Sequence, residues 1–159
     1  MRRSDREIID LDRMCELLEE EEVLRLALSD AEGTYILPLN YGYKAENGSV
    51  SFFIHGAREG RKAGILQDAA RDGREIPFEI DGRRSALVAD SCSASYYYMS
   101  VIGKVKISVL EGDEKIDGLN TLMHHIMPAP EYHYQEEVLQ RTLMCKLSVT
   151  EWSCKEHKA

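Results

Sequence analysis

The residues best suited to chemistry lie in the segment 59–64, which reads Glu-Gly-Arg-Lys-Ala-Gly. Arg61 and Lys62 stand at the start of a predicted helix, next to a glycine that lets a ligand approach the backbone. The free N–H groups of a first helical turn, the positive end of its dipole and two charged donors together favour an anion. The segment therefore predicts a phosphate site, with a solvated basic helix start as the alternative. It is not a Walker loop, because Gly-x-x-x-x-Gly-Lys-[Ser/Thr] is absent.

Histidine is the next candidate for chemistry. His55 ends a strand just before this loop, so a ring nitrogen could face whatever the cations hold, and its pKa suits proton transfer at neutral pH. A hydrogen-bonded structural histidine is the alternative. His124 and His125 are adjacent on a predicted helix and point about 100° apart, the wrong geometry for joint chelation, while His133 follows two prolines. We expect no metal site, and we expect reduced, mostly buried thiols at Cys15, Cys92, Cys145 and Cys154.

Two later strands carry aromatic and polar side chains that could face a ligand. Tyr96, Tyr98 and Ser100 share one strand face because alternate residues point the same way. Ordinary β-propensity explains the tyrosines equally well. Trp152 either caps the barrel at a strand end or, with the nearby Lys155, stacks on and charge-pairs with a planar anionic ligand.

Hydrophobic spacing predicts the elements that position these residues. Helical spacing over 5–22, after Ser4 as a cap, predicts an N-terminal amphipathic helix that packs on the rest of the domain. Asn47 and Gly48 predict a hairpin, and Pro38 predicts an edge, a bulge or a break in its strand. Helices are also predicted over 56–71, 113–127 and 135–139, and strands over 23–28, 34–43, 49–55, 75–81, 85–89, 96–110 and 141–152. Six or seven strands without a βαβ rhythm predict a mainly β fold, a small antiparallel barrel with flanking helices.

Length and charge exclude several classes of protein. The chain has 159 residues and a formal net charge of −8, which predicts one domain over 1–159 and disfavours nucleic acid as a partner. No apolar run has the length of a signal peptide or a membrane span, so we expect a cytoplasmic protein. The charge is uneven. The segment 58–74, called here the basic island, has five basic residues against three acidic ones and is the predicted seat of a single phosphate.

In their order, these fragments resemble the pyridoxamine 5′-phosphate oxidase-like, FMN-binding split β-barrels, most closely the nitroimidazole-resistance (Nim-type) branch. Each fragment is weak alone, but their joint order and spacing are specific over nearly the whole chain. The resemblance rests on Val23-Leu-Arg-Leu-Ala, Tyr35-Ile-Leu-Pro-Leu-Asn-Tyr-Gly-Tyr, Phe52-Phe-Ile-His-Gly-Ala followed by Gly60-Arg-Lys, Tyr98-Met-Ser-Val-Ile-Gly and Trp152-Ser-x-Lys-Glu.

The resemblance implies a homodimer with two FMN molecules in clefts between the subunits. It implies that Arg61 and Lys62 grip the FMN phosphate and that His55 lies near the flavin ring. The remaining implied cofactor-binding residues are the backbone stretch Pro38, Leu39, Asn40 and Tyr41, the strand residues Tyr98 and Ser100, and the C-terminal Trp152 and Lys155, the last two from either subunit. The sequence lacks a clear basic set for a second phosphate near its C-terminus, so we do not expect oxidation of pyridoxamine phosphate.

The leading hypothesis is an FMN-dependent oxidoreductase. A nicotinamide or another donor would reduce the flavin, and the reduced flavin would pass electrons to a small planar acceptor such as a nitroaromatic. His55 would orient the substrate or assist proton transfer. A flavin- or haem-binding module without turnover is the alternative; His124, His125 or His133 could ligate a haem iron, but nothing in their spacing selects haem. A third hypothesis is a barrel whose acidic surface serves as a scaffold for protein interactions.

Overall fold

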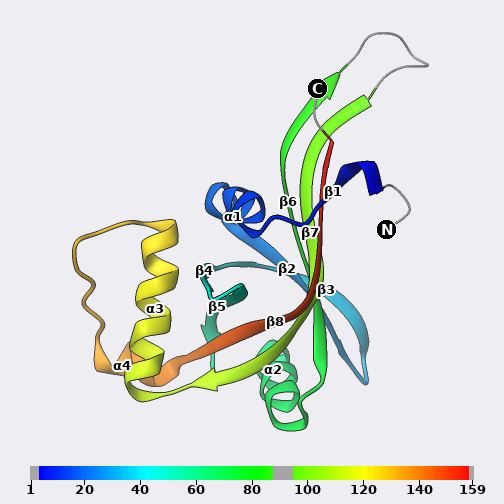
Figure 1. Cartoon of the computed structure of the whole chain (residues 1–159). Coiled ribbons are helices and arrows are strands. Elements are labelled where there is room, and N and C mark those ends of the chain that lie inside the picture. Colours follow the sequence, from blue (N-terminus) through cyan, green and yellow to red (C-terminus); the bar gives the residue numbers. More distant parts are fainter. Residues whose placement is uncertain (1–3, 88–94, 158–159) are drawn as a thin grey trace.

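The protein folds into one strongly curled antiparallel sheet with helices packed against it (Figure 1). The computed structural model describes residues 4–87 and 95–157. The strands are β1 (Glu7–Ile8), β2 (Val23–Asp30), β3 (Gly33–Asn40), β4 (Gly42–Glu46), β5 (Ser49–Ala57), β6 (Glu75–Leu87), β7 (Ser95–Leu110) and β8 (Thr142–His157). The helices are a 3-10 turn (Ser4–Arg6), α1 (Leu11–Glu20), α2 (Arg61–Asp72), α3 (Gly112–Ile126) and α4 (Glu136–Arg141). The strand order is β3-β2-β6-β7-β8-β5-β4, with β1 added beside β8.

The sheet curls around a single large apolar core. Alternate residues of β2 and β7, such as Leu26 and Val101, are fully buried in it, as the period of a strand with one covered face requires. Helices α1 and α2 insert Leu17 and Leu66 into the same core. Helix α3 covers a second, smaller cluster on the opposite face of β5 and β8, made by Phe53, Leu110, Leu119 and Met144. The face opposite the main core is called the outer face below.

Local turn chemistry behaves as the sequence predicts. Asn47 and Gly48 have φ angles of 52° and 77° and close the β4–β5 hairpin between Glu46 and Ser49. Pro38 lies in β3, an edge strand, and pairs there with Arg25 of β2; an edge strand tolerates proline because one side of it has no neighbouring strand. The strand breaks at Tyr41 instead, because its ring is buried in the core and its hydroxyl donates to the Leu18 carbonyl at 2.9 Å.

The N-terminal helix begins later than its periodicity predicts. Helix α1 starts at Leu11 with Asp10 as the cap, whose carboxylate accepts from the Asp12 N–H at 3.3 Å, so the prediction of Ser4 as the cap is wrong. Ile8, which was expected on the helix, lies in β1 and pairs with Cys154 of β8. A strand-edge hydrogen-bond ladder was available to these residues, and the helical spacing of the apolar residues could not reveal it.

Residues 4–87 and 95–157 form eight strands, one or two more than the expected six or seven. The predicted strand at 34–43 divides at Tyr41, the predicted strands at 75–81 and 85–89 merge into β6 across an irregularity between Gly82 and Ser85, and β1 is added. Positions 88–89 of the predicted strand, and Cys92, lie outside the described residues. Cys15, Cys145 and Cys154 are free thiols, and burial raises the pKa of Cys145 to about 12 and that of Cys154 to about 11.

Helix α3 packs unusually close to β4. A methyl group on Gly42 would lie 2.5 Å from the Leu122 Cα and the Thr121 carbonyl oxygen, so only glycine permits this approach. At its start, α3 is held by the buried ammonium of Lys115, which donates to the carbonyls of Leu139 at 2.5 Å and Thr142 at 2.7 Å. None of the described helices is long and apolar enough to cross a membrane.

Candidate functional site

The start of α2 is an open, uncapped helix terminus. Gly60 is the N-cap residue, with a φ of 98° that a side chain would disfavour, and among the described residues no side chain caps the first-turn N–H groups. A methyl group added at Gly60 or Gly64 would meet nothing within 4 Å. The N–H groups and dipole of this turn are therefore accessible to an anion.

The two cations at this terminus point to different parts of the fold. The Nε and Nη2 of Arg61 both donate to the Asp30 carboxylate at 2.7 Å, and Nη2 also donates to the Gly33 carbonyl at 3.0 Å. The Nη1 of Arg61 lies 3.6 Å from the Glu32 carboxylate, and its guanidinium carbon lies 4.5 Å from the centre of the Tyr35 ring. Arg61 is thus bound to the β2–β3 hairpin.

Lys62 instead extends over the end of β5. A methyl group on Gly56 would lie 2.7 Å from the Lys62 Cε and closer still to its Nζ, so the ammonium rests where Gly56 lacks a side chain. Among the described residues, Lys62 has no hydrogen-bond or ion-pair partner. It is half-buried beside the helix terminus.

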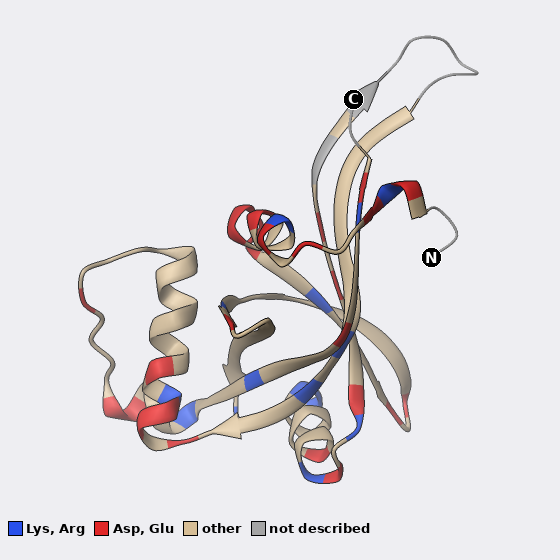
Figure 2. Ribbon diagram, in the orientation of Figure 1, with Lys and Arg blue, Asp and Glu red and all other residues tan. Residues whose placement is uncertain are grey.

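The basic island is therefore less basic than its composition indicates. Arg58 pairs with Glu111, Arg61 with Asp30, Arg71 with Asp68 and Arg74 with Asp72. Within the part of the chain that the structure describes, Lys62 is the island's one cation without an ion pair. Figure 2 shows the acidic residues of α1 well away from α2.

His55 precedes Gly56 in β5 and lies on the outer face of the strand, whereas the Lys62 ammonium rests over Gly56 on the opposite face. His55 pairs with Met144 of β8, and its side chain is exposed. Neighbouring chain removes enough water from the ring to lower its pKa, and the positive charge of Lys62 lowers it further. At neutral pH His55 is uncharged, with one nitrogen able to donate and the other able to accept.

The stretch 38–41 contributes mainly backbone and small surface. Pro38 and Asn40 are exposed on the outer face, whereas Leu39 packs against the core. The Asn40 amide donates to the Glu22 carbonyl at 3.1 Å. Because Tyr41 is 0% exposed, only its backbone is available to a ligand.

A second polar group lies on the ribbon formed by β7 and β8. Ser100 pairs with Lys155, and the Lys155 Nζ lies 5.8 Å from the centre of the Tyr98 ring. Burial by itself raises the pKa of Tyr98, but interactions of its hydroxyl with Lys155 and Arg6 outweigh that effect, so the pKa lies below its usual value. The sequence predicts that Tyr98 and Ser100 share a face of one strand, and the structure adds Lys155 of β8 to them.

Trp152 does not belong to that group. It packs against the main core, as does its alternate neighbour Cys154, whereas Lys155 lies on the outer face with Tyr98. The expectation that Trp152 and Lys155 stack together on one ligand is wrong, because residues three apart in a regular strand point to opposite faces. Trp152 lines a cavity of about 260 Å³ with Phe78 and Gly103.

The predicted residues therefore form two separate groups within one chain. His55 pairs with Met144, which pairs with Leu110, while Ser100 lies ten residues earlier on β7. At about 3.3 Å per residue, the two groups are about 30 Å apart along the strand. One mononucleotide cannot contact both groups in a single copy of the chain.

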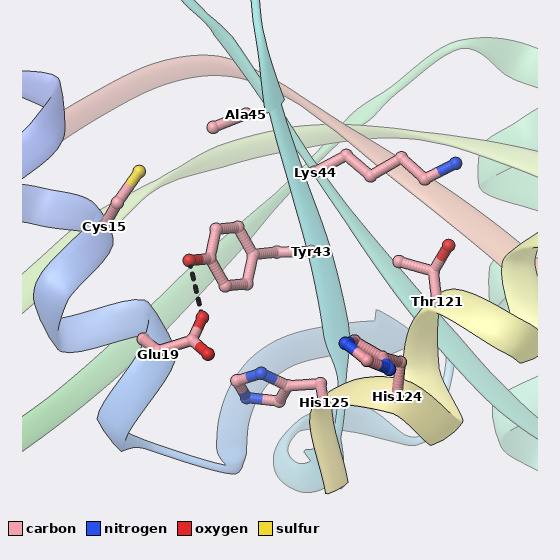
Figure 3. Close-up of a pocket in the computed structure, with 8 residues that line it drawn as sticks. All are labelled: Cys15, Glu19, Tyr43, Lys44, Ala45, Thr121, His124 and His125. Carbon is pink, nitrogen blue, oxygen red and sulfur yellow. Dashed lines mark hydrogen bonds between the residues drawn. The ribbon is translucent and has the colours of Figure 1, made fainter. Parts of the chain in front are cut away.

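A cavity of about 610 Å³ lies elsewhere, between α1, β4 and α3 (Figure 3). The Tyr43 hydroxyl donates to Glu19 at 2.9 Å, and His125 Nε2 donates to the Glu21 carbonyl at 3.0 Å. The His125 ring also packs 5.0 Å from that of Tyr41, so it holds α3 in place. The Glu19 carboxylate and the acidic surface of α1 make this cavity a poor phosphate site. Residues 4–87 and 95–157 contain no group of three His, Cys, Asp or Glu side chains arranged to hold a metal ion.

The sequence matches the family described as pyridoxamine 5′-phosphate oxidase over residues 10–156. The chain belongs to this family. The resemblance drawn from its motifs is confirmed, and its fold is the mainly β split barrel of flavin-binding proteins. No curated protein matches the sequence.

Solved structures with this fold are similar over nearly the whole chain. A candidate 5-nitroimidazole antibiotic resistance protein of Bacteroides thetaiotaomicron has a TM-score of 0.79 and 21% identity, covering 94% of this chain and 86% of its own. A flavocytochrome of Azotobacter vinelandii has a TM-score of 0.81 and 15% identity, covering 100% and 72%. An FAD- and haem-binding protein of Mycobacterium smegmatis has a TM-score of 0.80 and 20% identity, covering 97% and 74%. At these identities the similarity establishes the fold.

Sequence reasoning missed three residues of the site in this family member. Asp30 lies in a turn and gave no signal beyond turn chemistry, yet it holds Arg61. Gly56 also gave no signal in the sequence, although its lack of a side chain makes room for Lys62. Arg6 sits in a polar N-terminal stretch, and only the fold brings it to Tyr98.

Proposed function

We propose that this protein is an FMN-dependent oxidoreductase that transfers electrons from a reduced nicotinamide to a small planar acceptor, such as a nitroimidazole or another nitroaromatic. One observation carries the proposal. In a split barrel of the pyridoxamine 5′-phosphate oxidase family, the Lys62 ammonium has no ion-pair partner among the described residues and lies beside an uncapped helix terminus, over Gly56.

The residues present fit FMN. Its phosphate requires a cation and backbone donors, which Lys62 and the first turn of α2 supply. Open space at Gly60 lets the phosphate approach this turn. The free edge of β3 at Pro38 and Asn40 offers backbone groups and a flat surface to the ring. When bound, FMN supplies the redox chemistry, and the protein supplies binding and orientation.

His55 is the proposed catalytic residue. Loss of water around the ring, and the positive charge of Lys62, lower its pKa and so favour the neutral imidazole. A neutral imidazole can donate a hydrogen bond to an acceptor oxygen from one nitrogen and hold a proton on the other. This allows His55 to orient a nitro group without adding a charge near the ring.

We further propose that the working unit is a homodimer. Tyr98, Ser100 and Lys155 lie about 30 Å along β7 from the Lys62 group, so they reach a common ligand only across two copies. The outer face between the groups presents Ile36 and Ile102, which are 61% and 54% exposed, around the ion pairs of Arg25 with Glu79 and Asp81. Exposed apolar side chains on a sheet favour a partner surface.

The test is the spectrum and activity of the purified full-length chain. We expect a yellow protein that binds FMN, bleaches on addition of a reduced nicotinamide and recovers its colour on addition of a nitroimidazole. Sedimentation should give a dimer. A protein that takes up no flavin overturns the proposal, and a Soret band in place of a flavin band would indicate a haem-binding module. Binding and bleaching without recovery would refute the assignment of nitroaromatics as acceptors.

A further inference from the structure

Every nitrogen of the Arg61 guanidinium faces an oxygen of the segment 30–33. Nε and Nη2 bind Asp30, Nη2 also binds the Gly33 carbonyl, and Nη1 faces Glu32. The Tyr35 ring lies against the guanidinium carbon at 4.5 Å. The bidentate geometry with Asp30 is the strong form of an arginine–carboxylate pair.

The same contacts put negative charge close to the phosphate site. Asp30 and Glu32 both belong to the β2–β3 turn, and Arg61 is the first residue of α2. If Arg61 turned to a phosphate, it would leave both carboxylates without this partner and near a dianion. Turning Arg61 to a phosphate would therefore break its bidentate pair with Asp30, and the Arg61 guanidinium holds the pKa of that carboxyl below its usual range.

Lys62 is free of this competition. One residue further along the helix turns its side chain by about 100°, from the β2–β3 hairpin to the end of β5. There it rests against Gly56, and no carboxylate among the described residues pairs with it.

We propose that Asp30 is a specificity-determining residue of the cofactor site: it withholds Arg61 from the phosphate, so that Lys62 is the single cationic anchor. Asp30 thereby sets how strongly the site prefers a phosphorylated flavin over an uncharged one. Arg61 is a positioning residue that fixes the start of α2 against the β2–β3 hairpin. This inference rests on the proposed flavin function.

The test compares FMN with riboflavin, which lacks the phosphate, by fluorescence titration of the full chain. Lys62→Gln should weaken FMN binding about 10- to 100-fold and leave riboflavin unchanged, since a charge-assisted hydrogen bond is lost. Arg61→Gln should change the affinity for FMN by less than about twofold. It should lower the melting temperature by the small amount expected for the loss of an exposed ion pair. Asp30→Asn should tighten FMN binding about three- to tenfold with no effect on riboflavin, because it releases a second cation.

Two further variants separate this role from a merely structural one. Asp30→Glu keeps the carboxylate and should retain the wild-type ratio of FMN to riboflavin affinity. The double variant with Asp30→Asn and Arg61→Gln should lose the gain in FMN affinity. A large loss of FMN affinity in Arg61→Gln alone, or a gain that persists in the double variant, overturns the inference. A wild-type chain that binds neither flavin overturns the proposed function instead.

Discussion

Replacing Gly56 with alanine tests the site with a single methyl group. That methyl would lie 2.7 Å from the Lys62 Cε, whereas ordinary contacts begin at 3.4 Å, so Cε must withdraw by about 0.7 Å and the closer Nζ by more. A charge-assisted hydrogen bond from the Lys62 Nζ to the FMN phosphate, about 2.8 Å long, then becomes about 3.5 Å or longer, which is beyond the range of a good hydrogen bond. Its loss is worth about 1.5–3 kcal/mol, or roughly 10- to 100-fold in FMN affinity.

The assay is the ratio of FMN to riboflavin affinity, with thermal unfolding measured on the same samples. We expect Gly56→Ala to lose FMN affinity, keep riboflavin affinity and change stability by less than about 1 kcal/mol, since the clash is with the far end of a flexible side chain. The matched control is Gly64→Ala on α2, where the added methyl meets nothing within 4 Å. Alanine there should leave the ratio unchanged and, as a better helix former, raise the melting temperature.

Two outcomes would refute this reasoning. An unchanged ratio in Gly56→Ala means that the position of Lys62 over β5 does not matter for the phosphate. An equal loss of FMN and riboflavin affinity means that the methyl group acts on the strand or the ring and not through the ammonium.

Three other predictions follow from contacts in the fold. The pKa of His55, measured by NMR, should lie below the ordinary value of about 6.5 and rise in Lys62→Gln; an unchanged pKa in the variant contradicts the coupling. Between the pKa of His55 in the folded state and its pKa in the unfolded state, the folded protein binds fewer protons. The free energy of unfolding should therefore fall as the pH drops through that window. Gly42→Ala should destabilise the protein by about 1–3 kcal/mol in urea, because the clash is with backbone of α3; a neutral change would show that α3 shifts freely. Tyr98 should ionise below its usual pKa in an ultraviolet titration, and Lys155→Met should raise that pKa; no change would exclude their interaction.

Local features of the sequence predicted most of the fold. The Asn47 and Gly48 turn, the edge position of Pro38 and the start of α2 after Gly60 depend on the conformational preferences of a few adjacent residues. Strand alternation likewise placed Tyr98 and Ser100 on one face. Periodicity failed for Ile8, because pairing with β8 is a contact between residues far apart in the chain.

The site divides in the same way. The sequence by itself determined that two cations stand at an open helix terminus after a histidine, and that the order of motifs is that of the flavin split barrels. Only the tertiary structure decided which cation is free, because Asp30 reaches Arg61 across 31 positions of the chain while Gly56 makes room for Lys62. It also turned Trp152 inward and set the two predicted groups far apart. The charge and burial of a side chain depend on its neighbours in space, and a count of charged residues along the chain does not show which residues those neighbours are.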